Sequence, residues 1–172
     1  MQRKENKVKL GFKKVHPDAK LPTYAHVGDA GMDVYAVEDV FLKIGVPTIV
    51  QTGLVAEIPT GYELQVRSRS GLSLKGVNVF NAPGTIDCNY RGPIGIILRA
   101  INYNLMIMEG DEVWSKVHDK MHISGFEYVF HIEKGDRIAQ LVLAPVTKAE
   151  IVEVSEVSDT ERGTGGFGST GV

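Results

Sequence analysis

Apolar and polar residues alternate over much of the 172-residue chain. The alternation is clearest in three stretches, at Val8, Leu10 and Phe12, at Tyr62, Leu64 and Val66, and at Phe126, Tyr128, Phe130 and Ile132. A period of two places one side of a strand in the core and the other in solvent. We therefore predict half-buried strands there, and further strands over 47–58, 76–81, 93–101, 137–146 and 150–155.

Turn signals separate these predicted strands. They include Pro59-Thr60-Gly61, Ala82-Pro83-Gly84 and Lys134-Gly135-Asp136. Many short strands joined by such turns favour an all-β jelly roll or distorted β-barrel. We expect only two short helices, one near 71–75 and one over 111–121, where Val113, Trp114, Val117 and Met121 would share one face.

Composition bounds the class of protein. With 43% hydrophobic and 23% charged residues, the chain is long enough for one core. A formal net charge of −2 argues against binding to nucleic acid, because proteins that bind the phosphate backbone concentrate positive charge on their surface. Cys88 is the single cysteine, and no signal peptide or long apolar span is evident. We therefore expect a cytoplasmic protein that does not bind membranes.

The segment 28–34 contains small residues and then Asp33 at the mouth of a predicted strand. A carboxylate there could hold water around a magnesium ion. Ordinary turn chemistry is the alternative, because Asp-Ala-Gly sequences are common in turns.

The segment 67–73 combines two arginines and three serines with a glycine. It precedes a predicted helix start, where backbone N–H groups favour anions, and a triphosphate would suit it. The alternative is a solvated basic turn in which Ser70 caps the helix.

The segment 81–92 reads as an exposed hairpin with an acidic residue, Asp87, followed three residues later by Tyr90. Asp87 is the best general-base candidate, since a carboxylate near an α-phosphate could take a proton from attacking water. An Asx-turn is the alternative role for this carboxylate. Cys88 is more consistent with packing, because no histidine lies near it in sequence.

Two further segments complete the candidate chemistry. Arg137 and Gln140 stand where a loop enters an apolar strand, and a glutamine there needs a backbone or ligand partner. The stretch 162–171 contains five glycines with Arg162 and Phe167. We interpret it as a flap that orders over a bound nucleotide, with a solvated tail as the alternative.

These five segments, in this order, resemble the trimeric dUTP nucleotidohydrolase (dUTPase) family. The resemblance runs from 30–33 through 69–72, 84–92 and 135–140 to 162–171. It implies a jelly-roll domain over 1–161, a C-terminal flap over 162–172, and a homotrimer whose active sites are shared by three chains. The implied reaction is Mg²⁺-assisted hydrolysis of dUTP to dUMP and pyrophosphate, which lowers dUTP and supplies dUMP for thymidylate synthesis.

The same resemblance implies a role for each site residue. Asp87 would activate water, Tyr90 would pack on the deoxyribose, and Asn81, Gly84, Ile86 and Gly95 would surround uracil. The phosphates would be held by Arg69, Ser70, Gly71 and Gln140, and the flap would close through Arg162, Phe167, Gly168, Ser169 and Thr170. Asp33 would reach Mg²⁺ through water.

The stretch from about 102 to 126 is longer than the hairpin usual in the family, and resembles the extra segment of phage-encoded members. That resemblance allows a repressor-like protein partner at this segment, and a bacterial host cytoplasm as the location. His118 and His122 have a spacing that could bind zinc, although ordinary surface histidines are the alternative. The related dCTP deaminases place a catalytic glutamate where Ile97 stands, and a dUTP-binding regulator is the third alternative.

Overall fold

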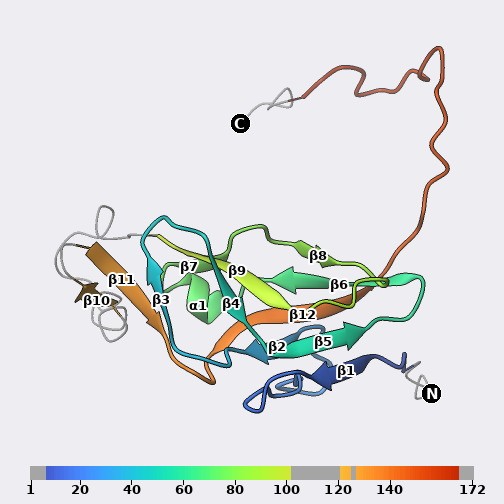
Figure 1. Cartoon of the computed structure of the whole chain (residues 1–172). Coiled ribbons are helices and arrows are strands. Elements are labelled where there is room, and N and C mark those ends of the chain that lie inside the picture. Colours follow the sequence, from blue (N-terminus) through green and yellow to red (C-terminus); the bar gives the residue numbers. More distant parts are fainter. Residues whose placement is uncertain (1–6, 102–120, 125–126, 167–172) are drawn as a thin grey trace.

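The computed structural model describes residues 7–101, 121–124 and 127–166. Its elements along the chain are β1 (Gly11–Lys14), β2 (Met32–Tyr35), β3 (Val40–Lys43), β4 (Thr48–Gln51), β5 (Leu54–Glu57), β6 (Tyr62–Arg67), α1 (Ser70–Ser73), β7 (Val77–Val79), β8 (Gly84–Ile86), β9 (Gly95–Ala100), β10 (Met121–Ser124), β11 (Glu127–Ile132) and β12 (Arg137–Pro145). The all-β expectation is therefore confirmed, and α1 matches the short helix predicted near 71–75 (Figure 1).

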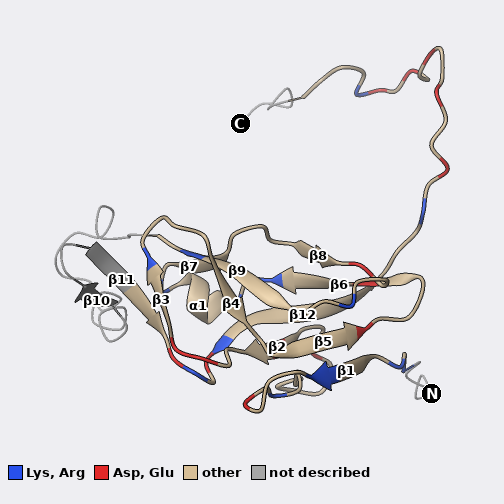
Figure 2. Ribbon diagram, viewed as in Figure 1, with Lys and Arg blue, Asp and Glu red and all other residues tan. Residues whose placement is uncertain are grey.

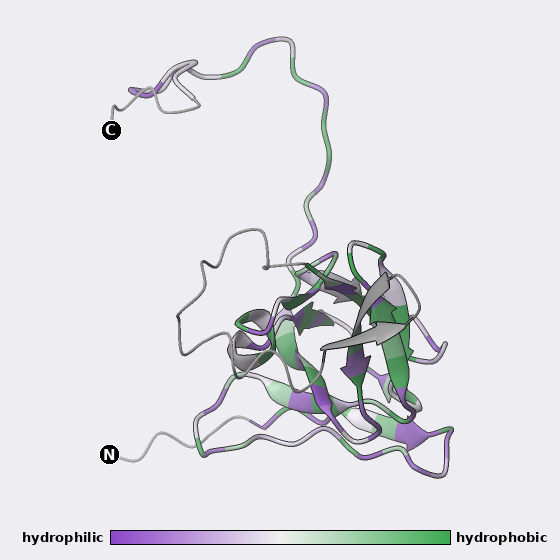
Figure 3. Cartoon of the chain, turned by 90° about the vertical axis from the view of Figure 1, so that its left-hand side faces the viewer, coloured by the Kyte–Doolittle hydropathy of each residue, from purple (hydrophilic) through white to green (hydrophobic). Residues whose placement is uncertain are grey.

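The strands form four small antiparallel sheets. Their strand orders are β2-β12-β6-β8, β4-β9-β7, β10-β11-β3 and β1-β5. The four-stranded sheet and the β4-β9-β7 sheet send their buried side chains into one core, which includes Val50, Leu64, Ile96, Leu98 and Leu141. Bands of hydrophobic and hydrophilic colour alternate along several strands in Figure 3, as the period-two pattern requires.

Burial follows the alternation closely in the central strands. In β9, Ile96 and Leu98 are fully buried, while Ile97 and Arg99, which alternate with them, are partly exposed. In β6, Leu64 is fully buried and Glu63 is not. The hydrophobic effect thus decides which face of each strand turns inward.

The predicted strand over 47–58 is two strands, β4 and β5. The chain changes direction at Gly53, whose φ of +65° is a conformation that side chains rarely adopt. A Cβ at Gly53 would also lie 2.6 Å from the His16 Cβ. Beside it, the buried Thr52 hydroxyl donates to the Ile94 carbonyl at 2.7 Å, which ties this corner to the core.

The prediction of a strand over 150–155 is wrong. Beyond Pro145 the chain leaves the sheets and extends away from them (Figure 1), and residues 145–164 are exposed. Ile151 and Val152 are 95% and 64% exposed. Alternation alone cannot make a strand, because a strand also needs a neighbour that supplies hydrogen bonds, and the described part of this chain offers none there.

The helix predicted over 111–121 lies outside the described residues, except Met121, which begins strand β10 instead. No helix in the described part of the chain is long and apolar enough to span a membrane.

Candidate active site

Asp33 is the centre of a polar cluster between β2, β12 and α1. Its side chain is only 5% exposed. The Arg69 Nε donates to Asp33 Oδ1 at 2.8 Å, and the Arg137 Nη1 donates to Asp33 Oδ2 at 3.2 Å. Arg69 also donates to the Arg137 carbonyl at 3.1 Å. A buried carboxylate is costly unless it is paired in this way, so Asp33 fixes both guanidinium groups in place.

Gln140 joins the same cluster from β12. It stands directly opposite Asp33 in the β12–β2 pairing, and its Nε2 lies 3.4 Å from Asp33 Oδ1. Gly31 leaves the space for it, because a Cβ there would lie 3.1 Å from the Gln140 Cδ. The partner that this glutamine needs is therefore a side chain.

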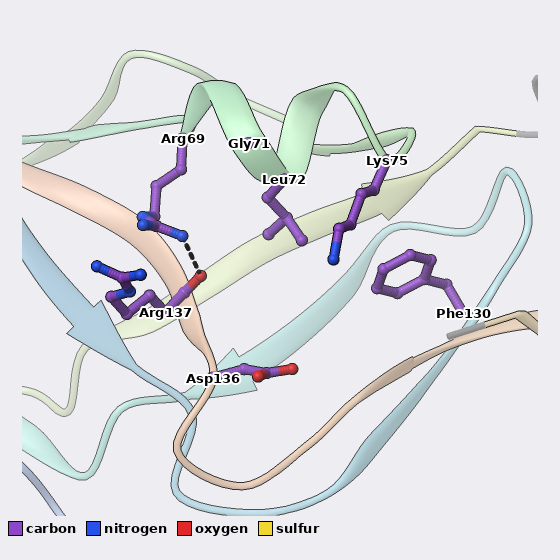
Figure 4. A pocket seen from close by; sticks show the side chains of 7 residues that line it. All are labelled: Arg69, Gly71, Leu72, Lys75, Phe130, Asp136 and Arg137. Carbon is purple, nitrogen blue, oxygen red and sulfur yellow. Dashed lines mark hydrogen bonds between the residues drawn. The ribbon is translucent and has the colours of Figure 1, made fainter. Parts of the chain in front are cut away.

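The two arginines open into a cavity of about 300 Å³ between α1 and the loop that leads into β12. Figure 4 shows its lining, which consists of Arg69, Gly71, Leu72, Lys75, Phe130, Asp136 and Arg137. The three cationic side chains outnumber the two nearby carboxylates, Asp136 in the lining and Asp33 behind the arginines, and the cavity therefore suits an anion.

Ser70 and Gly71 form the exposed start of α1 beside this cavity. The N-cap is Arg69, and no side chain makes a capping hydrogen bond, so the alternative role of Ser70 as a cap is wrong. A Cβ at Gly71 would meet none of the described atoms within 4 Å. Packing against the described residues therefore does not require this glycine.

A second cavity, of about 190 Å³, lies beside β8 and the start of β9. It is lined by Thr85, Ile86, Asp87, Tyr90, Pro93, Ile94 and Gly95. Asp87 is exposed, and its backbone carbonyl accepts a hydrogen bond from the Tyr90 N–H at 3.0 Å. Within the described residues no hydrogen bond or ion pair engages its carboxylate. The Asx-turn alternative is thus not observed, and the carboxylate is available to a ligand or water.

The loop after Asp87 is held by hydrogen bonds to its own backbone. The Tyr90 hydroxyl donates to the Pro93 carbonyl at 3.1 Å, and Arg91 donates to the carbonyls of Cys88 and Tyr90 at 2.7 and 2.9 Å. A Cβ at Gly92 would lie 2.5 Å from the Tyr90 Cζ. Gly92 therefore permits the position of the Tyr90 ring. Cys88 is half-buried and packs on the core, as its sequence context indicates.

Gly95 shapes the wall of this second cavity, and Gly84 lies in the same strand as two of its lining residues. A Cβ at Gly95 would lie 2.6 Å from the Ile49 Cγ2, so only glycine fits beneath that side chain. A Cβ at Gly84 would lie 3.1 Å from the Asn81 Nδ2, which places the exposed Asn81 amide close to the start of β8.

The two cavities share no lining residue and lie at opposite ends of β6. In the β6–β8 pairing Leu64 faces Ile86 and Val66 faces Gly84. Continued by one residue, this register brings Asp87 level with Glu63, near the start of β6, whereas Arg69 follows its end. Six residues of extended chain separate these positions, or about 20 Å at the rise of a strand. Figure 2 shows basic colour at the α1 end of β6 and acidic colour beyond β8 at the other end.

Arg162 lies apart from both cavities, in the extended tail. Its Nε donates to the Gly165 carbonyl at 2.8 Å. The other predicted flap residues, Phe167, Gly168, Ser169 and Thr170, lie outside the described residues, as does the His118 of the predicted zinc pair. Of His122 only the backbone is described. No group of three or more possible metal ligands occurs in the part of the chain that the structure describes.

Comparison with known proteins decides the family. The family model described as dUTPase matches residues 17–114 and 118–171, which is nearly the whole chain. This chain belongs to the dUTPase family. A deoxyuridine 5'-triphosphate nucleotidohydrolase from Picosynechococcus is 48% identical over 163 residues, which cover 94% of this chain and 98% of that relative.

Solved dUTPase structures show the same fold. The dUTPase of Staphylococcus bacteriophage 80alpha with dUPNHPP has a TM-score of 0.74 and 31% identity over 95% of this chain and 99% of its own. Phage dUTPases, of which this structure is an example, are described as controlling the transfer of virulence genes. A mutant dUTPase from phage phi11 of S. aureus, described as revealing the coordination of a structural Mg(II) ion, has a TM-score of 0.69 and 30% identity over 87% of this chain and 98% of its own.

The family model leaves a gap only at 115–117, inside the segment predicted as an insertion. The Picosynechococcus relative is matched almost end to end, so a chain of this length is not confined to phage dUTPases. The insertion over about 102–126 stays a prediction.

Proposed function

We propose that this chain hydrolyses dUTP to dUMP and pyrophosphate, as the names of its relatives indicate. The observation on which the proposal depends is the pairing of two complementary half-sites. One is an anion cavity whose arginines are fixed by Asp33, and the other is a smaller cavity beside the unengaged carboxylate of Asp87. The phosphate chain of a nucleoside triphosphate would fit the first half-site, and its nucleoside would fit the second.

The smaller cavity would hold the nucleoside. Backbone groups around Ile86 and Gly95, with the Asn81 amide, would pair with the edge of uracil, and Gly84 leaves room for that amide. The Tyr90 ring would lie against the deoxyribose, where the 2′-OH of a ribose would collide with it. Selectivity for the deoxy sugar then comes from exclusion.

Asp87 would act as the general base. Its carboxylate takes a proton from a water molecule, whose oxygen then bonds to the α-phosphorus. The bond from that phosphorus to the bridging oxygen breaks, and pyrophosphate leaves with the electron pair. An exposed carboxylate suits this role when no donor among the described residues competes for it, because water can then bind to it directly.

The larger cavity would hold the phosphate chain through Arg69, Arg137, Ser70 and Gly71. Gln140 belongs to the cluster that positions these groups, since its side chain is bonded to Asp33. Bidentate guanidinium groups suit phosphate oxygens, and their fixed orientation reduces the entropy lost on binding.

Mg²⁺ fits this arrangement when the phosphates supply most of its ligands. Both Asp33 oxygens are already occupied by donors, so the carboxylate is left to contact the ion through water. The described residues provide no cage of three ligands. When bound, the ion would neutralise charge that develops on the departing pyrophosphate.

A homotrimer would unite the half-sites. Because about 20 Å of strand separates Asp87 from Arg69 in one chain, a single triphosphate cannot reach both. We infer that each site takes Asp87 from one chain and the Asp33 cluster from a second. The tail, which is described as far as residue 166 and includes Arg162, extends away from its own domain. This direction supports a flap that closes over a site on another copy, to which Phe167, Gly168, Ser169 and Thr170 would contribute.

A regulatory role is the second candidate, because phage dUTPases such as the 80alpha protein are described as controlling the transfer of virulence genes. In this chain such a role would depend on a protein partner that binds at 102–126. The deaminase alternative is not favoured, since Ile97 on β9 pairs with Ile49 on β4 and neither can move a proton. The single half-buried Cys88 supports a reducing cytoplasm as the compartment.

Pyrophosphate release from dUTP, dCTP, dTTP and UTP, measured in parallel with Mg²⁺, tests the proposal. Rapid release from dUTP alone is the expected result. Ammonia from dCTP would mean a deaminase, and binding of dUTP without release would favour the regulator.

A further inference from the structure

Lys75 lies in the anion cavity away from the two arginines. In Figure 4 its ammonium group points into the space beside Leu72 and Phe130, whereas Arg69 and Arg137 face each other at the other end. All of these side chains line one continuous cavity. The cavity therefore has a cation at each end.

The helical turn sets the distance between these ends. Arg69 is the N-cap of α1, and the turn continues through hydrogen bonds from Leu74 to Ser70 and from Lys75 to Leu72. Six residues at the rise of an α-helix span about 9 Å. A single phosphate at the arginines would leave Lys75 without a partner, whereas a chain of phosphates extends toward it.

The Lys75 ammonium group has no hydrogen bond or ion pair with any of the described residues. Asp136, the one carboxylate in the lining, accepts the Glu133 N–H at 3.0 Å and so closes its own turn. The Lys75 stem is half-buried against the cavity wall. Holding a cation in a partly enclosed site without a partner is unfavourable, and an anion in the cavity would relieve that cost.

We propose that Lys75 binds the terminal phosphate of the substrate and makes the site select triphosphates over diphosphates. The proposal rests on the proposed function. The arginines hold the part of the phosphate chain nearer the nucleoside, and the ammonium group reaches the part beyond it. A deoxynucleoside diphosphate would leave Lys75 without its anion.

The test is binding of two non-hydrolysable ligands, dUPNHPP and the corresponding imidodiphosphate dUPNHP, to Lys75→Met by calorimetry with Mg²⁺. We expect the variant to bind the triphosphate analogue about tenfold more weakly, the effect of one charge-assisted hydrogen bond, and the diphosphate analogue as before. Lys75→Arg should keep most of the preference. Lys13→Met removes an exposed lysine from β1, outside both cavities, and should change neither affinity.

Equal weakening of both analogues, or no change in either, would overturn the proposal. Thermal unfolding of each variant separates a folding defect from a binding defect, and Lys75→Gln serves if the Met variant does not fold. Wild-type hydrolysis of dUTP, measured beside these titrations, tests the proposed function independently. The Lys75 proposal can therefore fail while that function holds.

Discussion

Asp33 and Asp87 are two carboxylates of one chain in opposite surroundings. Asp33 is buried, and its two oxygens accept hydrogen bonds from two arginines and a glutamine. Asp87 is exposed, and its carboxylate has no bonding partner within the described residues. The hydrogen-bond partners of an acidic residue therefore decide its role. A carboxylate whose oxygens already accept hydrogen bonds positions other groups, and one whose oxygens accept none is free to accept a proton.

The largest effect should come from Asp87→Asn. The change keeps the size of the side chain and removes its basicity, so we expect kcat to fall by about 10³-fold, within the range for loss of a general base. Affinity for dUPNHPP and the melting temperature should stay close to wild type. Steady-state pyrophosphate release, with calorimetry and thermal unfolding, checks all three.

If Asp87→Asn lost binding and stability together, the exposed carboxylate would have a structural role, and its contrast with Asp33 would disappear.

Asp33→Asn should instead reduce the stability of the protein and its affinity for dUPNHPP. Replacing the charge leaves Arg69 and Arg137 without their anion, and an amide presents N–H groups to these donors. Because Arg137 is 52% exposed, we expect a loss of about 2 kcal/mol in the free energy of unfolding, below the range for breaking fully buried pairs. Urea denaturation measures it.

The same variant should bind dUPNHPP more weakly, because the guanidinium groups lose their fixed orientation. A stable Asp33→Asn protein with normal affinity would show that the cluster does not position the arginines.

Gly92→Ala should act through Tyr90. The added methyl group would occupy space now filled by the phenol ring, whose Cζ lies 2.5 Å from the modified position. Displacing the ring should reduce the preference for dUTP over UTP by about tenfold, the value of one close steric contact in a selective site. The ratio of kcat/KM for the two nucleotides measures this.

Tyr90→Phe is the matched control for Gly92→Ala. It removes the hydrogen bond to Pro93 and keeps the ring, so it should retain most of the sugar selectivity. Equal loss in both variants would show that the hydroxyl, and not the ring position, is responsible.

The smallest effect should come from replacing Asp18, which lies outside both cavities. The Lys134 ammonium, 2.7 Å away, holds the pKa of the Asp18 carboxyl below its usual value of 3.8. The pair therefore stabilises the fold above pH 3.8, and its contribution is lost as the pH falls through the lowered pKa.

Asp18→Asn should lower the free energy of unfolding slightly at pH 7 and not at a pH well below 3.8, with dUTP hydrolysis unchanged at pH 7. Urea denaturation at both pH values measures the difference. A loss that persisted in acid would point to packing instead of charge.

The sequence predicted the fold wherever hydrophobic alternation coincided with strand pairing. Strands β6 and β9 have alternating core residues and a neighbour on each side, whereas 150–155 has no neighbouring strand among the described residues and lies outside the sheets. The split of 47–58 depends on Gly53, whose conformation only its tertiary neighbours explain. Local pattern therefore predicts burial, and long-range pairing decides which segments become strands.

The candidate site was less accessible to prediction. The segments with Asp33, Arg69 and Gln140 are visible in the sequence, but the ion pairs that join them span 36 and 104 residues and follow only from the topology. Lys75 carries no recognisable signal, because it enters the cavity through the direction of one helical turn. The separation of Asp87 from Arg69 likewise required the β6–β8 register.

The most direct test of two half-sites from different chains is subunit mixing. Asp87→Asn and Arg69→Ala, each inactive alone, would be unfolded together, refolded in equal amounts and assayed for dUTP hydrolysis. If each site takes Asp87 from one chain and Arg69 from another, random assembly leaves both residues intact in about one site in four, and about a quarter of wild-type activity should return. No recovery, in assemblies shown by mass spectrometry to contain both variants, would contradict the account.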